Sequence, residues 1–186
     1  VAGPNDPVYR PPASQGLVLE GELAVVIGQR CRFVPRDKAY EVIAGYTAVN
    51  DMSARDLGKT NVPNLFDWFQ VKAFDSSLPM GPCLVLKDEI ADPHNLQLQV
   101  RVNGKVVQEA STGDMIFKIP ETVEFLSDFI TLEPGDIIAT GTPGGSLDPL
   151  KRGDQVEVEI KNIGVLRSII ADINAEEELD ARPGRS

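Results

Sequence analysis

Alternation of apolar and polar residues predicts two β-hairpins. Over residues 96–102 every second residue is apolar, which is the spacing of a strand with one buried face. Asn103 and Gly104 follow at once, and this pair tolerates the positive φ angles that a two-residue hairpin turn requires. Residues 155–160 and 165–170 show a similar alternation on either side of a short linker that ends in glycine. Both regions are therefore predicted to form antiparallel hairpins.

Two continuous apolar runs predict strands of another kind. Residues 23–27 and 83–86 carry no charged or amide side chain. A strand with one face in water alternates, whereas a strand that is covered on both faces does not. We therefore expect both runs to be strands buried on both faces.

Helical spacing is confined to two short segments. Residues 35–45 begin with a proline, place Ala39, Val42 and Ile43 on one face, and end at a glycine. A second segment starts at Pro120 and aligns apolar residues at helical intervals. The chain is thus predicted to be mostly β with short helices (α+β), in a single domain over residues 1–186 with a frayed tail at 173–186.

Composition narrows the functional class. The 186 residues carry 28 acidic and 18 basic side chains, a formal net charge of −10, which disfavours nucleic acids and anionic membrane surfaces as partners. No apolar run is long enough to span a membrane and no secretory leader is recognised at the first residues, so a cytoplasmic protein is expected. Cys31 and Cys83 are too few and too far apart for a disulfide framework or a zinc site, and we expect two buried free thiols.

Two Glu-x-Glu pairs in the chain differ in their surroundings. Glu157 and Glu159 alternate strictly with apolar residues, as expected on the wet face of a half-buried strand. Glu20 and Glu22 instead stand at the start of an unbroken apolar run, on either side of a glycine. On a strand their side chains point the same way, with bases about 6.6 Å apart. The pair therefore either lies on an exposed lead-in to the strand or converges on one cation, because unpaired burial is costly.

Further charged residues favour the second reading. Asp51 follows another apolar stretch and is followed closely by Arg55, while Lys72 lies in a segment rich in aromatic residues. The segment LEPGDIIATGTPGG ends a predicted strand in a Thr/Gly loop, whose backbone N–H groups and hydroxyl suit an anion. Three acids, two cations and such a loop make a coherent metal and oxyanion site. Hard oxygen ligands favour Mg²⁺, with Mn²⁺ or Ca²⁺ as alternatives, over zinc.

The order of several blocks resembles the fumarylacetoacetate hydrolase family. The matching pieces are EGELAVVIG, GYTAVNDMSARD, KAFDSSLPMGP, VNGKVVQEASTGDMIF, LEPGDIIATGTPGG and KRGDQVEVEIKNIGVL, which together span nearly the whole chain. The resemblance implies a mixed β-roll, commonly assembled as a homodimer. It also implies that Glu20, Glu22 and Asp51 hold a divalent cation. Substrate contacts are expected at the positions that match the family's lysine, threonine and arginine: Lys72, Thr142 and Arg55.

The chain also departs from the family pattern. Gly58 stands where relatives often carry a glutamine that contacts substrate, and Val71 replaces a frequent glycine beside the lysine. Nothing here matches the family's upstream lid, which bears a His and a Glu as the acid–base pair, so we expect that lid to precede Val1. His94 is the single histidine and is interpreted as a turn residue rather than a catalytic one.

The expected function follows from the resemblance and from the chemistry of the site. A cation that binds a 2-oxo acid can polarise the keto oxygen and stabilise an enolate. The first expectation is hydrolysis of a C–C bond in a β-diketo acid such as an acylpyruvate or fumarylacetoacetate. Decarboxylation or isomerisation of an oxo-dicarboxylate in aromatic catabolism is the alternative. An inactive metal-binding or scaffolding relative, and a ligand-binding β domain without metal, are the rivals from other classes.

Overall fold

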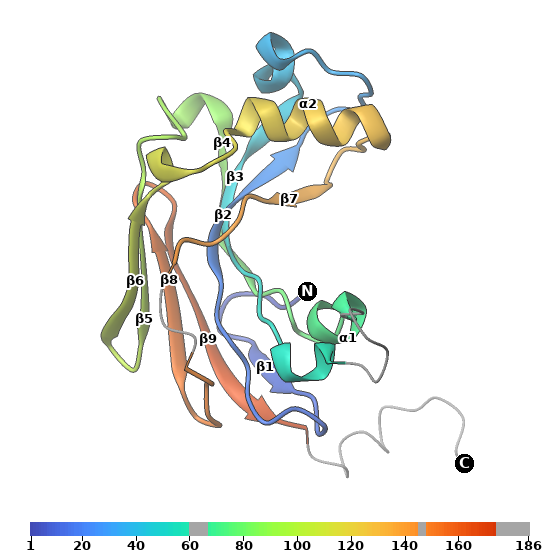
Figure 1. Cartoon of the computed structure of the whole chain (residues 1–186). Coiled ribbons are helices and arrows are strands. Elements are labelled where there is room, and N and C mark those ends of the chain that lie inside the picture. Colours follow the sequence, from blue (N-terminus) through green and yellow to red (C-terminus); the bar gives the residue numbers. More distant parts are fainter. Residues whose placement is uncertain (60–66, 145–147, 174–186) are drawn as a thin grey trace, which may run out of the picture.

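The fold consists of two β-sheets and a few short helices. A computed structural model describes residues 1–59, 67–144 and 148–173, and the predicted frayed tail lies almost entirely outside these residues. Within them, the helices are α1 and α2 together with four 3₁₀ turns (Figure 1). The strands are β1 (Pro7–Arg10), β2 (Gly21–Ile27), β3 (Ile43–Asn50), β4 (Met80–Leu86), β5 (Gln97–Val102), β6 (Lys105–Ser111), β7 (Ile137–Ala139), β8 (Gln155–Ile160) and β9 (Gly164–Asp172), and the helices are η1 (Arg36–Val42), η2 (Arg55–Gly58), α1 (Trp68–Lys72), η3 (Lys87–Glu89), η4 (Thr112–Asp114) and α2 (Ile119–Phe129).

The strands form a five-stranded sheet in the order β1-β9-β8-β5-β6 and a four-stranded sheet in the order β4-β3-β2-β7. Among the described residues, the strands pair antiparallel except β1 with β9, so the larger sheet is mixed. Both predicted hairpins are confirmed: β5 and β6 turn at Asn103 and Gly104, which have φ values of 51° and 80°, and β8 turns into β9. The prediction of a mostly β chain is confirmed.

The core lies where the two sheets face each other. It includes Leu23 and Val25 from β2, and Val100, Val158 and Leu166 from the larger sheet, all almost fully buried. Burying such side chains is the main favourable contribution to folding, at roughly 1.5–3 kcal/mol each. The predicted buried strand at residues 23–27 is therefore confirmed.

For the second apolar run, residues 83–86, the prediction of burial on both faces is wrong. Residues 83–86 do lie in β4, but β4 is an edge strand of the smaller sheet and its outer side chains are open to solvent. Leu84 is 47% exposed and Leu86 is 56% exposed. Cys83 is an exposed free thiol and Cys31 is only partly buried, so the prediction of two buried thiols is also wrong.

The first predicted helix is shorter than its sequence pattern. Residues 36–42 form the 3₁₀ helix η1, with Ala39 and Val42 buried as expected, and the chain enters β3 at Ile43. Gly45, the expected helix stop, lies inside β3, where an added Cβ would come within 2.1 Å of the Val85 carbonyl oxygen. The second predicted helix is confirmed as α2, with its proline in the first turn.

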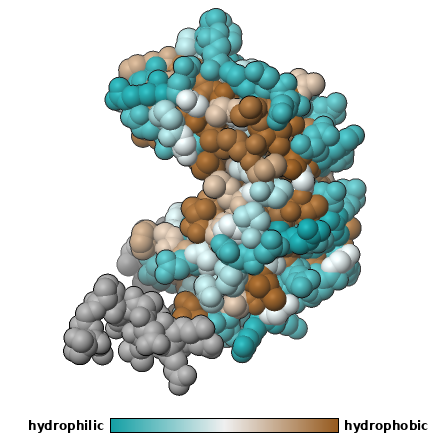
Figure 2. Space-filling model, turned by 180° about the vertical axis from the view of Figure 1, so that it is seen from behind, coloured by the Kyte–Doolittle hydropathy of each residue, from teal (hydrophilic) through white to brown (hydrophobic). Residues whose placement is uncertain are grey.

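The surface is hollowed between two parts of the molecule. Figure 2 shows a deep notch with apolar residues along its wall, and Figure 1 places α2 on one side of this space and α1 on the other.

In the described ranges, no helix is both long enough and apolar enough to cross a membrane.

Candidate metal centre

Glu20, Glu22 and Asp51 come together in space. Each offers a carboxylate oxygen, and these oxygens lie within 4.8 Å of one another. Glu20 precedes β2 and Glu22 lies within it, while Asp51 directly follows β3, the antiparallel neighbour of β2. The backbone N–H of Asp51 donates to the Glu20 carbonyl at 2.8 Å, so the strand pairing itself fixes the cluster. Glu20 and Glu22 are buried, which rules out an exposed lead-in to the strand.

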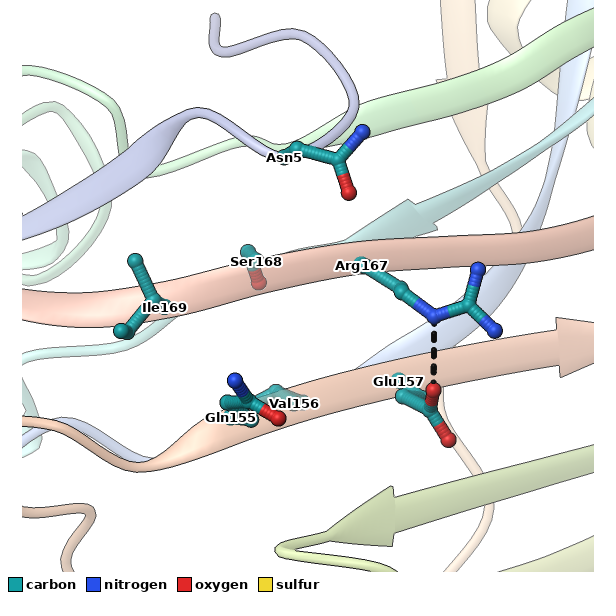
Figure 3. Close-up of a pocket in the computed structure, with 7 residues that line it drawn as sticks. All are labelled: Asn5, Gln155, Val156, Glu157, Arg167, Ser168 and Ile169. Atoms are coloured by element: carbon teal, nitrogen blue, oxygen red, sulfur yellow. Dashed lines mark hydrogen bonds and ion pairs between the residues drawn. The ribbon is translucent and has the colours of Figure 1, made fainter.

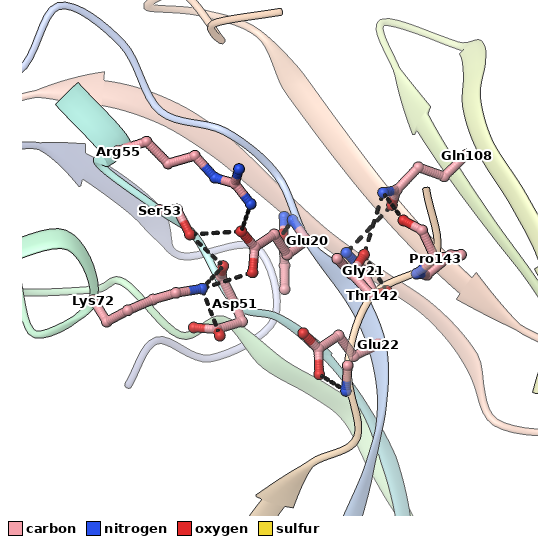
Figure 4. Close-up of polar contacts among 12 residues, drawn as sticks. Glu20, Gly21, Glu22, Asp51, Ser53, Arg55, Lys72, Gln108, Thr142 and Pro143 are labelled. Carbon is pink, nitrogen blue, oxygen red and sulfur yellow. Dashed lines mark hydrogen bonds and ion pairs between the residues drawn. The ribbon is translucent and has the colours of Figure 1, made fainter. Parts of the chain in front are cut away.

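Lys72 approaches the cluster from the end of α1. Its Nζ lies 2.6 Å from Glu20 Oε2 and 2.6 Å from Asp51 Oδ2, and it also donates to the Asp51 carbonyl at 3.1 Å (Figure 4). Asp67 caps α1 by accepting the Gln70 N–H, and Val71 is fully buried beside the lysine. The helix is thereby anchored so that Lys72 points at the acids.

Arg55 and Ser53 hold the other oxygen of Glu20. Arg55 Nη2 lies 3.0 Å from Glu20 Oε1, and the Ser53 hydroxyl donates to the same atom at 2.8 Å. Burial alone would raise the pKa of Glu20, but hydrogen bonds from Lys72, Ser53 and Arg55 outweigh it and keep that pKa below its usual value. Glu20 is therefore an anion with a fixed orientation.

Glu22 has fewer donors. Its Oε2 accepts the backbone N–H of Gly141 at 2.6 Å, and among the described residues no side chain donates to it. Burial, with the nearby charges of Asp51 and Glu20, raises the pKa of Glu22 to about 7 despite the Gly141 contact. An additional positive charge at the cluster would relieve this repulsion.

The donor set therefore fits a divalent cation. Three carboxylates are hard oxygen ligands from three chain positions, as Mg²⁺, Mn²⁺ and Ca²⁺ prefer. With Lys72 and Arg55 the cluster has a formal charge of −3 + 2 = −1, which a divalent cation would change to +1. An anionic ligand would then be attracted even though the whole protein carries −10.

Thr142 lies on the loop that follows β7, next to Gly141. Its hydroxyl donates to the Gly21 carbonyl at 3.1 Å and accepts an N–H from Gln108 at 3.2 Å. Its predicted contact with substrate stays a prediction, since these two bonds describe only how the side chain is held. Ser53 and Gln108 were not singled out from the sequence, where nothing marks them, because the burial of these two side chains is known only from the fold.

Other predicted positions have structural explanations. His94 Nε2 accepts the Ile119 N–H at 3.1 Å, at the start of α2, which agrees with a structural rather than a catalytic role. Glu157 pairs with Arg101 and Arg167, as expected for a residue on a wet strand face. Gly58 is buried at the end of η2 and accepts the Asp67 N–H through its carbonyl.

A cavity of about 210 Å³ lies beside β8, the strand that carries Glu157 and Glu159 (Figure 3). Its charged residues, Glu157 and Arg167, satisfy each other at 2.8 Å. No cluster of acids or cations converges there among the residues drawn, so it is not the candidate site.

The geometry agrees with comparisons to known proteins. Residues 1–171 match the family model described as fumarylacetoacetate (FAA) hydrolase C-terminal. The chain belongs to the fumarylacetoacetate hydrolase family. A mitochondrial oxaloacetate tautomerase of Bos taurus is 45% identical over 174 residues, covering 89% of this chain and 54% of that protein.

Two solved structures of the family show the same fold. A 5-carboxymethyl-2-hydroxymuconate delta-isomerase from Mycobacterium smegmatis aligns with a TM-score of 0.85 and 38% identity, over 92% of this chain and 65% of that one. A maleylpyruvate hydrolase from Sphingobium sp. SYK-6, in complex with manganese(II) and pyruvate, aligns with a TM-score of 0.82 and 35% identity, over 92% and 61%. The chain thus spans about half to two thirds of these relatives.

Proposed function

We propose that this chain forms the metal-binding catalytic part of an enzyme that acts on a small anionic 2-oxo acid. The observation that carries the proposal is the convergence of Glu20, Glu22 and Asp51 with two cationic side chains. Family members named as tautomerase, isomerase and hydrolase support an enzymatic role. Mg²⁺ is the proposed ion, with Mn²⁺ as the alternative that the manganese complex of a relative supports.

The bound cation would supply Lewis-acid stabilisation of negative charge on the keto oxygen of the substrate. Lys72 and Arg55 would bind the substrate carboxylate, because they are the positive charges that lie directly beside the acids. Ser53 would keep Glu20 oriented as a ligand. Thr142 would contact the distal part of the substrate by turning its hydroxyl proton from the Gly21 carbonyl to a substrate oxygen.

Two reactions share this electron sink. Hydrolysis of a β-diketo acid C–C bond remains the first candidate, supported by the pyruvate complex of a maleylpyruvate hydrolase, since cleavage of an acylpyruvate releases pyruvate. Tautomerisation or isomerisation of an oxo-dicarboxylate is the second, favoured by 45% identity to an oxaloacetate tautomerase. The two differ in where water and the general base are placed.

A substrate panel separates these reactions. The protein is incubated with acetylpyruvate, fumarylacetoacetate and oxaloacetate, in Mg²⁺, in Mn²⁺ and in chelator. Mass spectrometry follows C–C cleavage, and ultraviolet absorbance follows the enol of oxaloacetate. Metal-dependent conversion of at least one compound is expected, whereas conversion of none would favour the inactive or scaffolding relative.

Substitution of the ligands provides the direct test. Glu20→Ala and Asp51→Ala should abolish metal-dependent turnover while the far-ultraviolet circular dichroism spectrum stays that of the wild type. The matched control is Glu159→Gln, which removes a similar charge from the other Glu-x-Glu pair and should leave turnover unchanged. Full turnover in either alanine variant, with chelator controls, would refute the assignment.

A further inference from the structure

The loop after β7 runs along the edge of β2 beside the acids. Thr140 donates to the Leu23 carbonyl through both its N–H, at 3.2 Å, and its hydroxyl, at 2.7 Å. The next residue, Gly141, donates its N–H to Glu22 Oε2 at 2.6 Å. Thr142 then donates its hydroxyl to the Gly21 carbonyl. The position of this loop therefore sets the position of the Glu22 carboxylate.

Gln108 reaches this loop from β6, in the other sheet. Its Nε2 donates to Thr142 Oγ1 at 3.2 Å and to the Pro143 carbonyl at 3.1 Å, so both amide protons are used (Figure 4). Its Oε1 accepts the Gly21 N–H at 3.4 Å. The side chain is 5% exposed, so these hydrogen bonds are not in competition with bulk water.

Apolar packing supports the loop only on part of its surface. Gly141, Thr142 and Pro143 line a cavity of about 730 Å³, which also borders Leu23 on the face of β2 opposite to Glu22. Side chains that line such a space lack neighbours on one side and so lose the contacts that fix a well-packed segment. Polar contacts from Gln108 therefore restrain the loop from the opposite sheet, in addition to the hydrogen bonds that Thr140 and Thr142 make with β2.

The three acids differ in how they are held. Glu20 and Asp51 are fixed by side chains, with Lys72 bridging the two. Glu22 receives only the Gly141 backbone donor among the described residues. A disturbance of the loop should consequently reach Glu22 and leave the other two acids in place.

We infer that Gln108 is a positioning residue for Glu22, acting through the Gly141–Pro143 loop, and that it raises the affinity of the cluster for a divalent cation. The inference rests on the metal site of the proposed function. It assigns to this side chain an indirect role in that site, two contacts removed from the ligand.

The first test is the affinity of the protein for Mn²⁺, measured by isothermal titration or by the electron paramagnetic resonance signal of free Mn²⁺. Gln108→Met keeps the length of the side chain and removes its donors and acceptor. Loss of a group that orients a metal ligand typically weakens binding about 10–100-fold, and we expect the lower end, about tenfold, because the contact is indirect. An affinity within twofold of the wild type would overturn the inference.

Two control variants separate positioning from general destabilisation. Thr112→Val removes a buried hydroxyl that accepts the Leu96 N–H at 2.9 Å, at the end of the same hairpin. It should lower the unfolding midpoint and leave the Mn²⁺ affinity unchanged. Gln97→Met makes the same substitution at an exposed strand position and should change neither. Equal affinity losses in Thr112→Val and Gln108→Met would contradict a positioning role.

A double-mutant cycle tests the route through the loop. Thr142→Val alone should weaken Mn²⁺ binding, because it removes the hydroxyl that bonds both Gln108 and the Gly21 carbonyl. The double variant with Gln108→Met should lose less affinity than the product of the two single losses, because the two changes share the Gln108–Thr142 hydrogen bond. Single losses that multiply fully would show that Gln108 and Thr142 act on the metal site independently.

The proposed function and this inference fail differently. Mn²⁺ binding without conversion of any oxo acid would remove the function and leave the positioning role in place. Wild-type affinity in Gln108→Met would remove only the positioning role. A wild-type protein that binds no Mn²⁺ would overturn both.

Discussion

Gly21 is the residue that allows two glutamates to flank a point of close contact between the sheets. A Cβ at this position would lie 2.4 Å from Val100 Cγ2 and 3.3 Å from Val158 Cγ1. Val100 is fully buried and β-branched, so it cannot turn away easily. The Glu-Gly-Glu sequence thus combines a ligand face toward the site with the absence of a side chain toward the core.

We therefore predict that Gly21→Ala destabilises the protein. Overpacking of this kind typically costs about 1–3 kcal/mol, which chemical denaturation would measure as a lower midpoint. Gly144→Ala is the matched control, because a Cβ there meets no atom of the described residues within 4 Å and its φ is not positive. Its free energy of unfolding should change by no more than about 0.5 kcal/mol. Equal stability of the two variants would contradict the close contact.

At this scale the sequence predicted the charged residues of the site but not their supports. The acids and cations could be found because charge next to an apolar run is costly without a partner. Ser53 and Gln108 could not be assigned a role, since a serine in a loop and a glutamine in a strand are ordinary at exposed positions. Gln108 lies opposite Val100 in the pairing of β5 with β6, and from there its amide reaches Gly21 and Thr142. Contacts of this kind depend on which residues the fold brings together.

Among the elements, α2 depends on a histidine that is distant in the sequence. Ile119 is the first residue of the helix, and its N–H would have no partner within the helix. His94 Nε2 accepts this N–H, which requires that nitrogen to be unprotonated. Burial, followed by the positive charge of Lys118, lowers the pKa of His94, against a smaller opposing effect of Asp92.

A pH dependence of stability follows from this contact. Above the ordinary histidine pKa of about 6.5, His94 is neutral in both states and the stability is fully present. As the pH falls below that value, the unfolded chain takes up a proton that the folded chain resists, so stability is lost toward the lower folded pKa. Tyr40, whose hydroxyl lies 3.5 Å from Nδ1, carries no charge in this range.

His94→Gln isolates this effect. We expect the free energy of unfolding of the wild type to fall more steeply between about pH 6.5 and pH 5 than that of the variant. The difference between the two curves cancels the contributions of other groups, such as Glu22. Parallel curves would show that His94 is not kept neutral by the fold.

The elements themselves were predictable where local pattern and tertiary pairing agree. The two hairpins and α2 have both, with turn residues or a leading proline at their ends. Residues 43–45 continue a helical pattern, yet they pair with β2 and β4, and strand pairing overrides a weak local preference. A close approach of Val85 explains Gly45 better than a helix stop does.

For the whole molecule, the arrangement of the sheets determines which apolar segments are buried, and the sequence pattern alone does not. An apolar run such as residues 83–86 predicts burial, but β4 lies at a sheet edge and leaves Leu84 and Leu86 open in this chain. Phe125 and Phe129 of α2 are likewise exposed, with ring centroids 5.0 Å apart. Large exposed apolar surface is typical of interaction sites. The homodimer implied by the family resemblance stays a prediction.

The proposed metal site predicts that the stability of the whole chain depends on a divalent cation. Three carboxylates within 4.8 Å repel one another in the folded state, whereas in the unfolded chain Asp51 is separated from Glu20 and Glu22. A divalent cation that binds only the folded state therefore stabilises it by mass action, by about 2.7 kcal/mol at a free concentration of 100 times Kd. For a chain of this size that free energy corresponds to a rise in Tm of about 5–11 °C.

Mg²⁺ titration followed by thermal unfolding should show this rise in the wild type and its reversal by chelator. Glu22→Gln removes the charge of a proposed ligand, relieves repulsion and keeps an oxygen that can accept the Gly141 N–H, so its Tm without metal should be at least that of the wild type, while its response to Mg²⁺ should be largely lost. Glu159→Gln changes the charge of the protein equally and should keep the full response, because Glu159 lies on β8 beside Arg101. A Mg²⁺ response that depends on net charge alone would be the same in both variants, and that result would place the stabilising ion elsewhere on the acidic surface.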